Sequence, residues 1–283
     1  MRWLIPVLAM AALLTGGCNS GPHRTAEVLA VAAAKLPLDP ADRAWEEAPE
    51  FAAKLLPQDL VEPRLMKAST PEVLVRALVS GNEIAFRMEW ADNTRNDLPG
   101  AGRFPDACAV QIPRKIEPDL PDPQMGIEGK SVEIAYWRSD WQATMNGRAD
   151  DIHSLFPNAS VDHYPFEAHS LAKGSGEQKE FATRYAPAEA VGNRRVGPRA
   201  TPVEDLIAEG PGTLAPAGRT VSRGRGEFGK QGWSVVIVRP LPEGLTPKTR
   251  TAIAFAVWEG SQQESGARKM RTGWNTLSVR EAR

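Results

Sequence analysis

The stretch PEVLVRALVSGNEIAFRMEW, residues 71–90, contains the clearest fold signal of the chain. Two runs rich in apolar and β-branched residues flank the turn-forming triplet Ser80-Gly81-Asn82, which is typical of a β-hairpin. In the second run apolar and polar residues alternate, so one face of that strand should be buried and the other should carry Arg87 and Glu89. The buried face would consist of Ile84, Phe86, Met88 and Trp90.

Other strand-like runs follow the same rule. VEIAYW (132–137) alternates, whereas WSVVIVRP (233–240) and AIAFAVWEG (252–260) are strongly β-branched or aromatic. Gly and Pro number 24 each, which suits a turn-rich protein. Short helices are predicted at residues 41–47 and 201–208, and a long loop at 172–199. The sequence therefore predicts a mainly β protein, an antiparallel β-sandwich with long loops and a few short helices.

Composition and charge exclude several functions. The chain has 283 residues, 42% of them hydrophobic, and a formal net charge of −1. This balance gives no electrostatic basis for binding nucleic acid. No Ser-His-Asp set, paired carboxylates or phosphate-binding loop indicates an active site, and GRGEFG (224–229) opens no strand-to-helix unit. We therefore expect a chain that is not itself an enzyme.

The N-terminus has the features of a targeting segment. Arg2 precedes an apolar stretch too short to span a bilayer, followed by Thr15-Gly16-Gly17-Cys18. This resembles the lipobox of bacterial lipoproteins, although Leu14 stands one residue early; an ordinary secretory signal is the alternative. We predict a signal peptide at 1–17, a tether and lead-in at 18–34 and one domain at 35–283. Lipidation of Cys18 would anchor the exported protein at the periplasmic side of a membrane.

A methionine in a Pro/Gly-rich turn requires an explanation. Met125 lies in PQMGIEGKSVEIAYWRSDWQ (123–142), just before a predicted strand. It is either a soft metal ligand or a side chain that fills a gap in the core. With Cys18 lipidated, Cys108 is left alone, so no internal disulfide forms. The sequence has no C-x-x-C-H motif, so a haem would not be covalently attached.

Several stretches in order resemble one family, the haem b (gamma) subunit of type II molybdenum enzymes of the dimethyl sulfoxide reductase superfamily. Ethylbenzene, dimethyl sulfide, selenate and chlorate enzymes carry such a subunit. The resemblance covers nearly the whole mature chain. Its pieces are FRMEWADNTRND (86–97), FPDACAVQIP (104–113), MGIEGKSVEIAYWRSDWQ (125–142), FPNASVDHYPF (156–166), TPVEDLIAEGPGTL (201–214), GWSVVIVRPL (232–241) and AFAVWEGSQQESGARKMRTGW (254–274).

The resemblance implies a non-covalent haem b whose iron is bound by Met125 and Lys269. Trp137 is a weaker candidate for the pocket wall and Arg138 for a haem propionate. The neighbouring Met270 should point away from Lys269 if the segment is extended. Rival ligands are Lys130 and Lys230, and the four histidines (His23, His153, His163 and His169), which we interpret as surface or loop residues.

The function implied is electron transfer. The haem would relay electrons between an iron–sulfur subunit of a molybdenum catalytic complex and a periplasmic cytochrome or quinone-linked partner. Two axial ligands leave iron no open position for substrate. The alternative is a lipid-anchored carbohydrate-binding β-sandwich without haem, because LPLDPADRAWEEAP (36–49) also resembles the opening of such modules.

Overall fold

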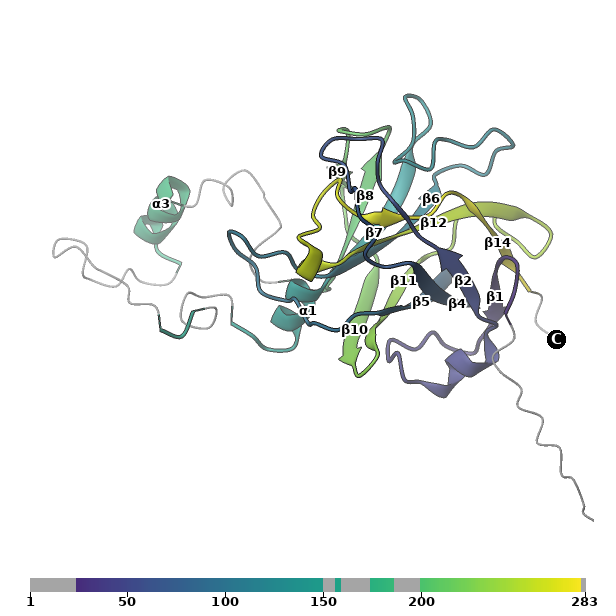
Figure 1. Ribbon diagram of the computed structural model, residues 1–283, viewed down its shortest axis with the longest axis horizontal. Helices are drawn as coiled ribbons and strands as arrows, with labels where there is room; N and C mark the ends of the chain where they lie inside the picture. Colours follow the sequence, from purple (N-terminus) through teal and green to yellow (C-terminus); the bar gives the residue numbers. More distant parts are fainter. Residues whose placement is uncertain (1–23, 150–155, 159–173, 186–198, 281–283) are drawn as a thin grey trace, which may run out of the picture.

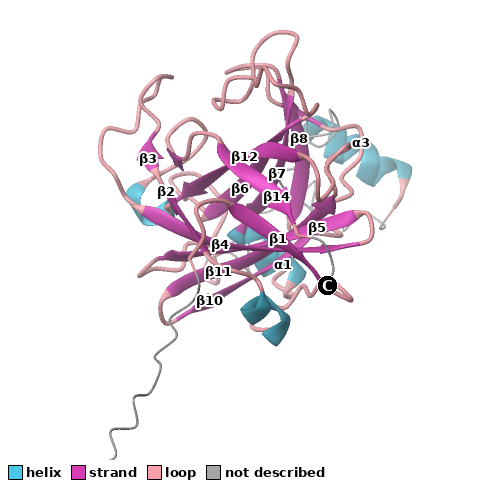
Figure 2. Cartoon of the chain, turned by 90° about the vertical axis from the view of Figure 1, so that its right-hand side faces the viewer, coloured by secondary structure: helices cyan, strands magenta, loops and turns pink. Residues whose placement is uncertain are grey.

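The fold is known from a computed structural model that describes residues 24–149, 156–158, 174–185 and 199–280. Its strands form two packed layers, and its helices lie outside them (Figures 1 and 2). The strands are β1 (Val28–Ala32), β2 (Phe51–Lys54), β3 (Leu56–Pro57), β4 (Glu72–Ser80), β5 (Glu83–Ala91), β6 (Ala107–Pro113), β7 (Val132–Arg138), β8 (Val203–Ala208), β9 (Ala215–Pro216), β10 (Arg223–Gly229), β11 (Gly232–Pro240), β12 (Arg250–Trp258), β13 (Met270–Arg271) and β14 (Asn275–Val279). The helices are η1 (Arg43–Glu47), α1 (Ser139–Met145), α3 (Gly176–Tyr185) and η2 (Gly260–Gln262).

The two layers share one strand. The first layer has the order β10-β11-β5-β4-β1-β14, with β2 added to β4. The second has the order β12-β6-β7-β8-β9, with β13 on the free edge of β12 and β3 on β13. The first half of β12 pairs with β14 and its second half with β6, so β12 passes from one layer to the other.

The main core lies between the layers. The predicted hairpin is confirmed as β4 and β5, and Gly81 at its tip has a φ of 57°, a conformation that glycine adopts without steric cost. The apolar face of β5 is buried as expected. A cluster of three tryptophans, Trp90, Trp137 and Trp233, has ring centroids 5.0–6.5 Å apart. These rings fill the core beneath β10 and β11.

The N-terminal segment covers the opposite face of the first layer. Trp45 of η1 is fully buried against Leu78, Ala85 and Val236. Its indole Nε1 donates a hydrogen bond to the carbonyl of Asp39 at 3.1 Å, which satisfies the buried polar atom. The helix predicted at 41–47 is therefore confirmed as a short 3-10 turn.

Several expectations were wrong in detail. Residues predicted as a helix at 201–208 form β8, because pairing with β7 and β9 overrides the helix-like start at Pro202. The predicted loop at 172–199 contains α3, which lies to one side of the sandwich (Figure 1). The domain starts earlier than residue 35, since β1 pairs with both β4 and β14. Those two pairs are parallel, so the sandwich is not purely antiparallel.

Within the described ranges, no helix is long and apolar enough to cross a membrane.

Candidate cofactor site

The outer face of the second layer carries a separate hydrophobic cluster, which we call the outer cluster. Strand β7 sends Ile134 and Tyr136 to this face and Ala135 and Trp137 to the main core, because successive side chains alternate. The buried members of the outer cluster are Ala107, Ala109, Val132, Ile134, Leu206, Ala208, Ala256 and Trp258, with Met125, Tyr136 and Trp274 packed against them.

Alanines form the centre of the outer cluster. Ala109 and Ala256 lie opposite each other on β6 and β12, and Ala109 lies opposite Tyr136 on β7. The large side chains come from the edges: the rings of Tyr136 and Trp258 meet edge to face with centroids 5.1 Å apart. The small alanine side chains leave room for these two rings, which meet over β6.

Met125 reaches the outer cluster from a constrained turn. Its φ is 76°, which is uncommon for a residue with a side chain. The turn is held by hydrogen bonds: Gly210 N donates to the Met125 carbonyl at 2.8 Å, and Gln111 Nε2 of β6 donates to the Pro123 carbonyl at 2.8 Å. Gly126 follows at a φ of 85°, and a Cβ there would lie 2.9 Å from the Lys130 carbonyl. The Pro/Gly-rich sequence thus places the thioether on the cluster.

Lys269 reaches the same cluster from the strand on the opposite edge. The pairing of Met270 with Val257 and of Arg271 with Ala256 places Lys269 beside Trp258. Its Nζ lies 5.1 Å from the centroid of the Trp258 ring. Gln58 N donates to the Lys269 carbonyl at 2.9 Å. Met270 is fully buried in the main core, so the prediction that it points away from Lys269 is confirmed.

The Lys269 amine is in an unfavourable place for a charge. Burial, and to a smaller extent the positive charge of Arg271, lower the pKa of Lys269 to about 8. The Lys269 residue is half-buried. Among the described residues, Nζ forms no hydrogen bond or ion pair, only the contact with Trp258. An amine of this kind is easily deprotonated and free to bind a metal.

The two side chains approach the cluster from different ends. The turn of Met125 is attached to Gln111, whereas Lys269 adjoins Trp258, which pairs with Ala107 on β6. Ala107 and Gln111 are four residues apart on one strand, which corresponds to ~13 Å. Met125 and Lys269 therefore reach the outer cluster from opposite ends of β6.

Arg271 was missed by the sequence analysis. It lies on the cluster face opposite Ala256, and its buried Nε has no hydrogen-bond partner. Its guanidinium takes part in no ion pair among the described residues. Arg138, by contrast, binds Asp140 with two hydrogen bonds of 2.8 Å. The pairing of β13 with β12, which the sequence alone does not reveal, distinguishes the two arginines.

Other predicted residues lie elsewhere. Trp137 is fully buried in the main core, on the other side of the sheet from Met125, so it does not line the outer cluster, and its assignment to the pocket wall stays a prediction. Lys130 is ion-paired with Asp119, and Lys230 is exposed at the β10–β11 turn. His23, His153, His163, His169 and Cys18 lie outside the described residues.

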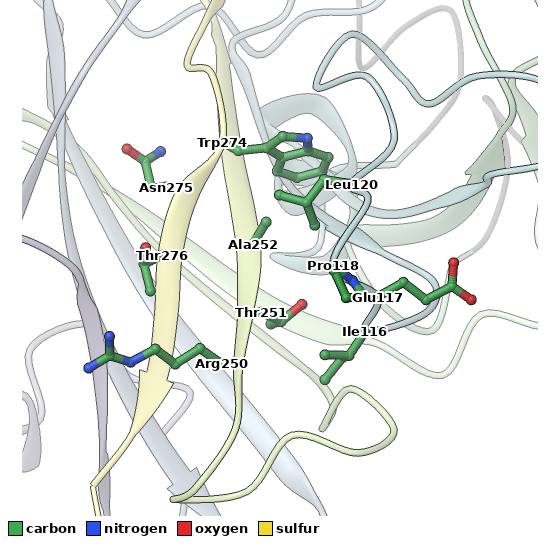
Figure 3. A pocket seen from close by; sticks show the side chains of 10 residues that line it. All are labelled: Ile116, Glu117, Pro118, Leu120, Arg250, Thr251, Ala252, Trp274, Asn275 and Thr276. Atoms are coloured by element: carbon green, nitrogen blue, oxygen red, sulfur yellow. The ribbon is translucent and has the colours of Figure 1, made fainter.

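A shallow pocket of about 380 Å³ adjoins the outer cluster and shares Trp274 with it (Figure 3). Trp274 Nε1 donates to the Pro121 carbonyl at 2.7 Å and so fixes the segment that leads to Met125. Leu120 lies next to the Trp274 ring in Figure 3. The remaining lining residues are Ile116, Glu117, Pro118, Arg250, Thr251, Ala252, Asn275 and Thr276.

Fold and site together define a β-sandwich module with a thioether and an unpaired amine on one hydrophobic face. The chain belongs to the ethylbenzene dehydrogenase family, whose profile matches residues 42–270. It is 22% identical over 275 residues to the putative respiratory nitrate reductase heme subunit ORF7 of Haloferax mediterranei (95% of this chain, 78% of that protein). It is 25% identical over 285 residues to chlorate reductase subunit gamma of Ideonella dechloratans (96% and 93%).

A family 9 carbohydrate-binding module from Caldicellulosiruptor kristjanssonii, solved in complex with cellotriose, aligns with a TM-score of 0.40 and 9% identity. The alignment covers 92% of this chain and 95% of that one.

Proposed function

We propose that this chain is a haem-binding electron-transfer subunit of a multi-subunit oxidoreductase and has no catalysis of its own. Its haem is of b type, held without a covalent bond, with Met125 and Lys269 as the axial ligands. The observation that carries this proposal is the unpaired Lys269 amine on the same hydrophobic cluster as Met125. Family membership and the printed name of the heme subunit relative support it.

The donor atoms suit haem iron. Methionine sulfur is a soft ligand that favours the ferrous state and raises the potential. Lysine binds a metal only as the neutral amine, and burial of Lys269 has already weakened its hold on the proton. A bound haem would supply a one-electron redox centre, and Met125 and Lys269 would hold its iron. The protein contributes the ligands, an apolar surround and exclusion of water.

Haem also carries two carboxylates, which need polar partners. Arg271 is better placed than Arg138 to bind one of them, since Arg271 shares the cluster face with Lys269 and its Nε is unpaired. Arg138 is already engaged with Asp140. A carboxylate on Arg271 would also offset the positive charge beside the amine.

The partners proposed are a molybdenum catalytic subunit, an iron–sulfur subunit that exchanges electrons with the haem, and a periplasmic cytochrome or quinone-linked acceptor or donor. Support comes from the relatives, which are named as subunits of reductases.

The location proposed is the periplasmic side of a membrane, with a lipid anchor on Cys18. Replacing Cys18 with serine should release the protein, expressed without partners, into the soluble fraction; continued membrane association would contradict the anchor.

Substitution of the axial ligands tests the proposal directly. The wild-type chain reconstituted with haem should give a low-spin, six-coordinate absorption spectrum. Lys269→Ala should open one face and permit carbon monoxide or imidazole to bind. Lys269→Arg should do the same, because a guanidinium stays charged and has no free lone pair. Met125→Ala should lower the reduction potential because ferrous iron loses its soft ligand.

The matched control is Lys130→Ala, which removes a lysine that is already ion-paired with Asp119. Its spectrum should equal that of the wild type. A low-spin spectrum that survives Lys269→Ala but disappears in His153→Ala, His163→Ala or His169→Ala would show that the ligand assignment is wrong. Acid–acetone should extract the haem completely; colour retained on the polypeptide would exclude a b-type site.

A further inference from the structure

Three buried carboxyl groups meet at the end of the main core, away from the outer cluster. Asp92 follows β5, Asp106 precedes β6 and Glu259 follows β12, so three distant parts of the chain contribute. Their exposed fractions are 5%, 0% and 7%. One oxygen of each lies within 4.8 Å of those of the other two. Three potential negative charges are thus enclosed in a small volume.

Hydrogen bonds fix the carboxylates but do not satisfy them all. Asp106 accepts from Asn96 N and Gly260 N at 2.8 Å and from Trp233 Nε1 at 2.9 Å. Asp92 Oδ1 accepts from Thr94 N at 2.9 Å. Asp92 Oδ2, however, is fully buried and has no hydrogen-bond donor. Its carboxyl group instead lies close to that of Glu259, which is another acceptor.

Among the described residues, no positive side chain compensates the cluster. The charges that act on the Asp92 carboxyl come from Asp106 and Glu259, the charge that acts on Asp106 comes from Glu259, and all are negative. Burial and these charges raise the pKa of Asp92 to about 7 and that of Asp106 to about 6. The arginines of the same region are engaged elsewhere: Arg95 and Arg148 bind Asp97, and Arg138 binds Asp140. A further positive group is needed to hold three ionised carboxylates there.

We propose that Asp92, Asp106 and Glu259 bind a divalent cation of the calcium class. All the donors are carboxylate oxygens, the ligands preferred by hard cations. The three carboxylate oxygens lie within 4.8 Å of one another, which is close enough for one Ca²⁺ ion with bonds of ~2.4 Å to bind all three. The ion would coordinate Asp92 Oδ2, the buried oxygen that has no hydrogen-bond donor.

Such an ion would tie two irregular segments together. The loop from Asp92 to Asp106 would be joined to the turn that begins at Glu259. That turn approaches the loop very closely, since a Cβ on Gly260 would lie 1.9 Å from the Phe104 carbonyl oxygen. The site depends on no haem and can be tested in its absence.

The test uses the full chain, treated with chelator and titrated with terbium and then calcium. Trp233 contacts Asp106, so its excitation should produce sensitised terbium emission that calcium displaces. Calcium should also raise the melting temperature. Asp92→Asn should weaken calcium binding by about tenfold or more, since affinity depends on the number of charged ligands. The control Asp97→Asn, in the same loop but paired with Arg95 and Arg148, should bind as the wild type does.

The competing occupant is a shared proton. In that case the wild type gives no sensitised emission, calcium leaves the melting temperature unchanged, and Asp92→Asn is as stable as the wild type or more stable, since an amide can donate to Glu259. That result overturns the proposal. If Asp92→Asn does not fold, the wild-type titration alone decides: displaceable emission supports the site, and its absence refutes it.

Discussion

The two faces of the second layer are built from the same strands, but their side chains are packed differently. On the inner face, Trp137, Val257 and Phe255 are packed tightly, and Gly226 is required because a Cβ there would lie 2.2 Å from the Trp137 ring. On the outer face, alanines lie beside the Tyr136 and Trp258 rings, and Met125, Tyr136 and Trp274 are only partly buried. The inner face is packed for stability, and the outer face carries the proposed ligand residues.

The contrast extends to polar atoms. The inner indoles of Trp137 and Trp233 have hydrogen-bond acceptors, Gln142 Oε1 at 3.4 Å and Asp106 Oδ2 at 2.9 Å. On the outer face, Lys269 and Arg271 carry charge without an ion-pair partner among the described residues. The main core also contains an unsatisfied polar atom, Trp90 Nε1, but the unpaired charged side chains Lys269 and Arg271 lie on the outer face. Uncompensated charges cost stability, so a ligand is expected on that face.

The largest effect on stability should come from the inner face. Trp137→Ala should lower the free energy of unfolding by ~3–5 kcal/mol, because a large buried ring leaves a cavity. Tyr136→Ala, the adjacent but half-buried residue, should cost clearly less. Urea denaturation of the haem-free proteins measures both. Equal losses would mean that the two faces contribute alike to folding and would remove the contrast.

A substitution at the alanines should affect the outer face selectively. Ala256→Leu should reduce haem affinity by about tenfold or more, because a branched side chain would occupy the centre of the cluster. The matched inner substitution is Ala135→Leu, which should instead destabilise the fold by ~1–3 kcal/mol through overpacking. Haem titration and urea denaturation separate the two outcomes. Full haem affinity in Ala256→Leu would place the cofactor elsewhere.

The smallest effect should be the pH dependence due to Lys269. Its folded pKa of about 8 lies below the ordinary value of 10.5, so between these values the unfolded chain binds more protons. The stability of the haem-free protein should therefore rise with pH across this window, by the linkage of proton binding to folding. Lys269→Met should be more stable than the wild type near neutral pH and should lack this rise. The free energy of unfolding of both proteins is measured by denaturation at several pH values. If it changes with pH in the same way in both, burial does not destabilise the Lys269 ammonium.

The fold could be predicted where the signal is local. Alternation in β5 and the Ser80-Gly81-Asn82 turn identified the hairpin, and the prediction that Met270 points away from Lys269 in an extended segment was correct. Residues 203–208 were misassigned because Pro202 and the nearby acids imitate a helix start, while the deciding interactions come from β7 and β9. Alternation in β7 could also have excluded Trp137 from the outer face.

The site could be predicted only in part. Met125 and Lys269 followed from family resemblance, and their roles as ligands stay a prediction. Arg271 and the carboxylate cluster depend on pairings between segments far apart in the chain, such as β13 with β12, and on the approach of Asp92 to Glu259. No local pattern in the sequence predicts these contacts between distant segments.

The position of β1 has a consequence for biosynthesis. This strand lies between β4 and β14, so the first described strand of the chain is hydrogen-bonded to the last. The first layer cannot be completed until β14 has been synthesised, and β13, which follows Lys269, emerges only shortly before it. Pairing of such distant segments makes folding slow. The nascent chain should therefore remain incompletely folded until β14 is available to pair with β1.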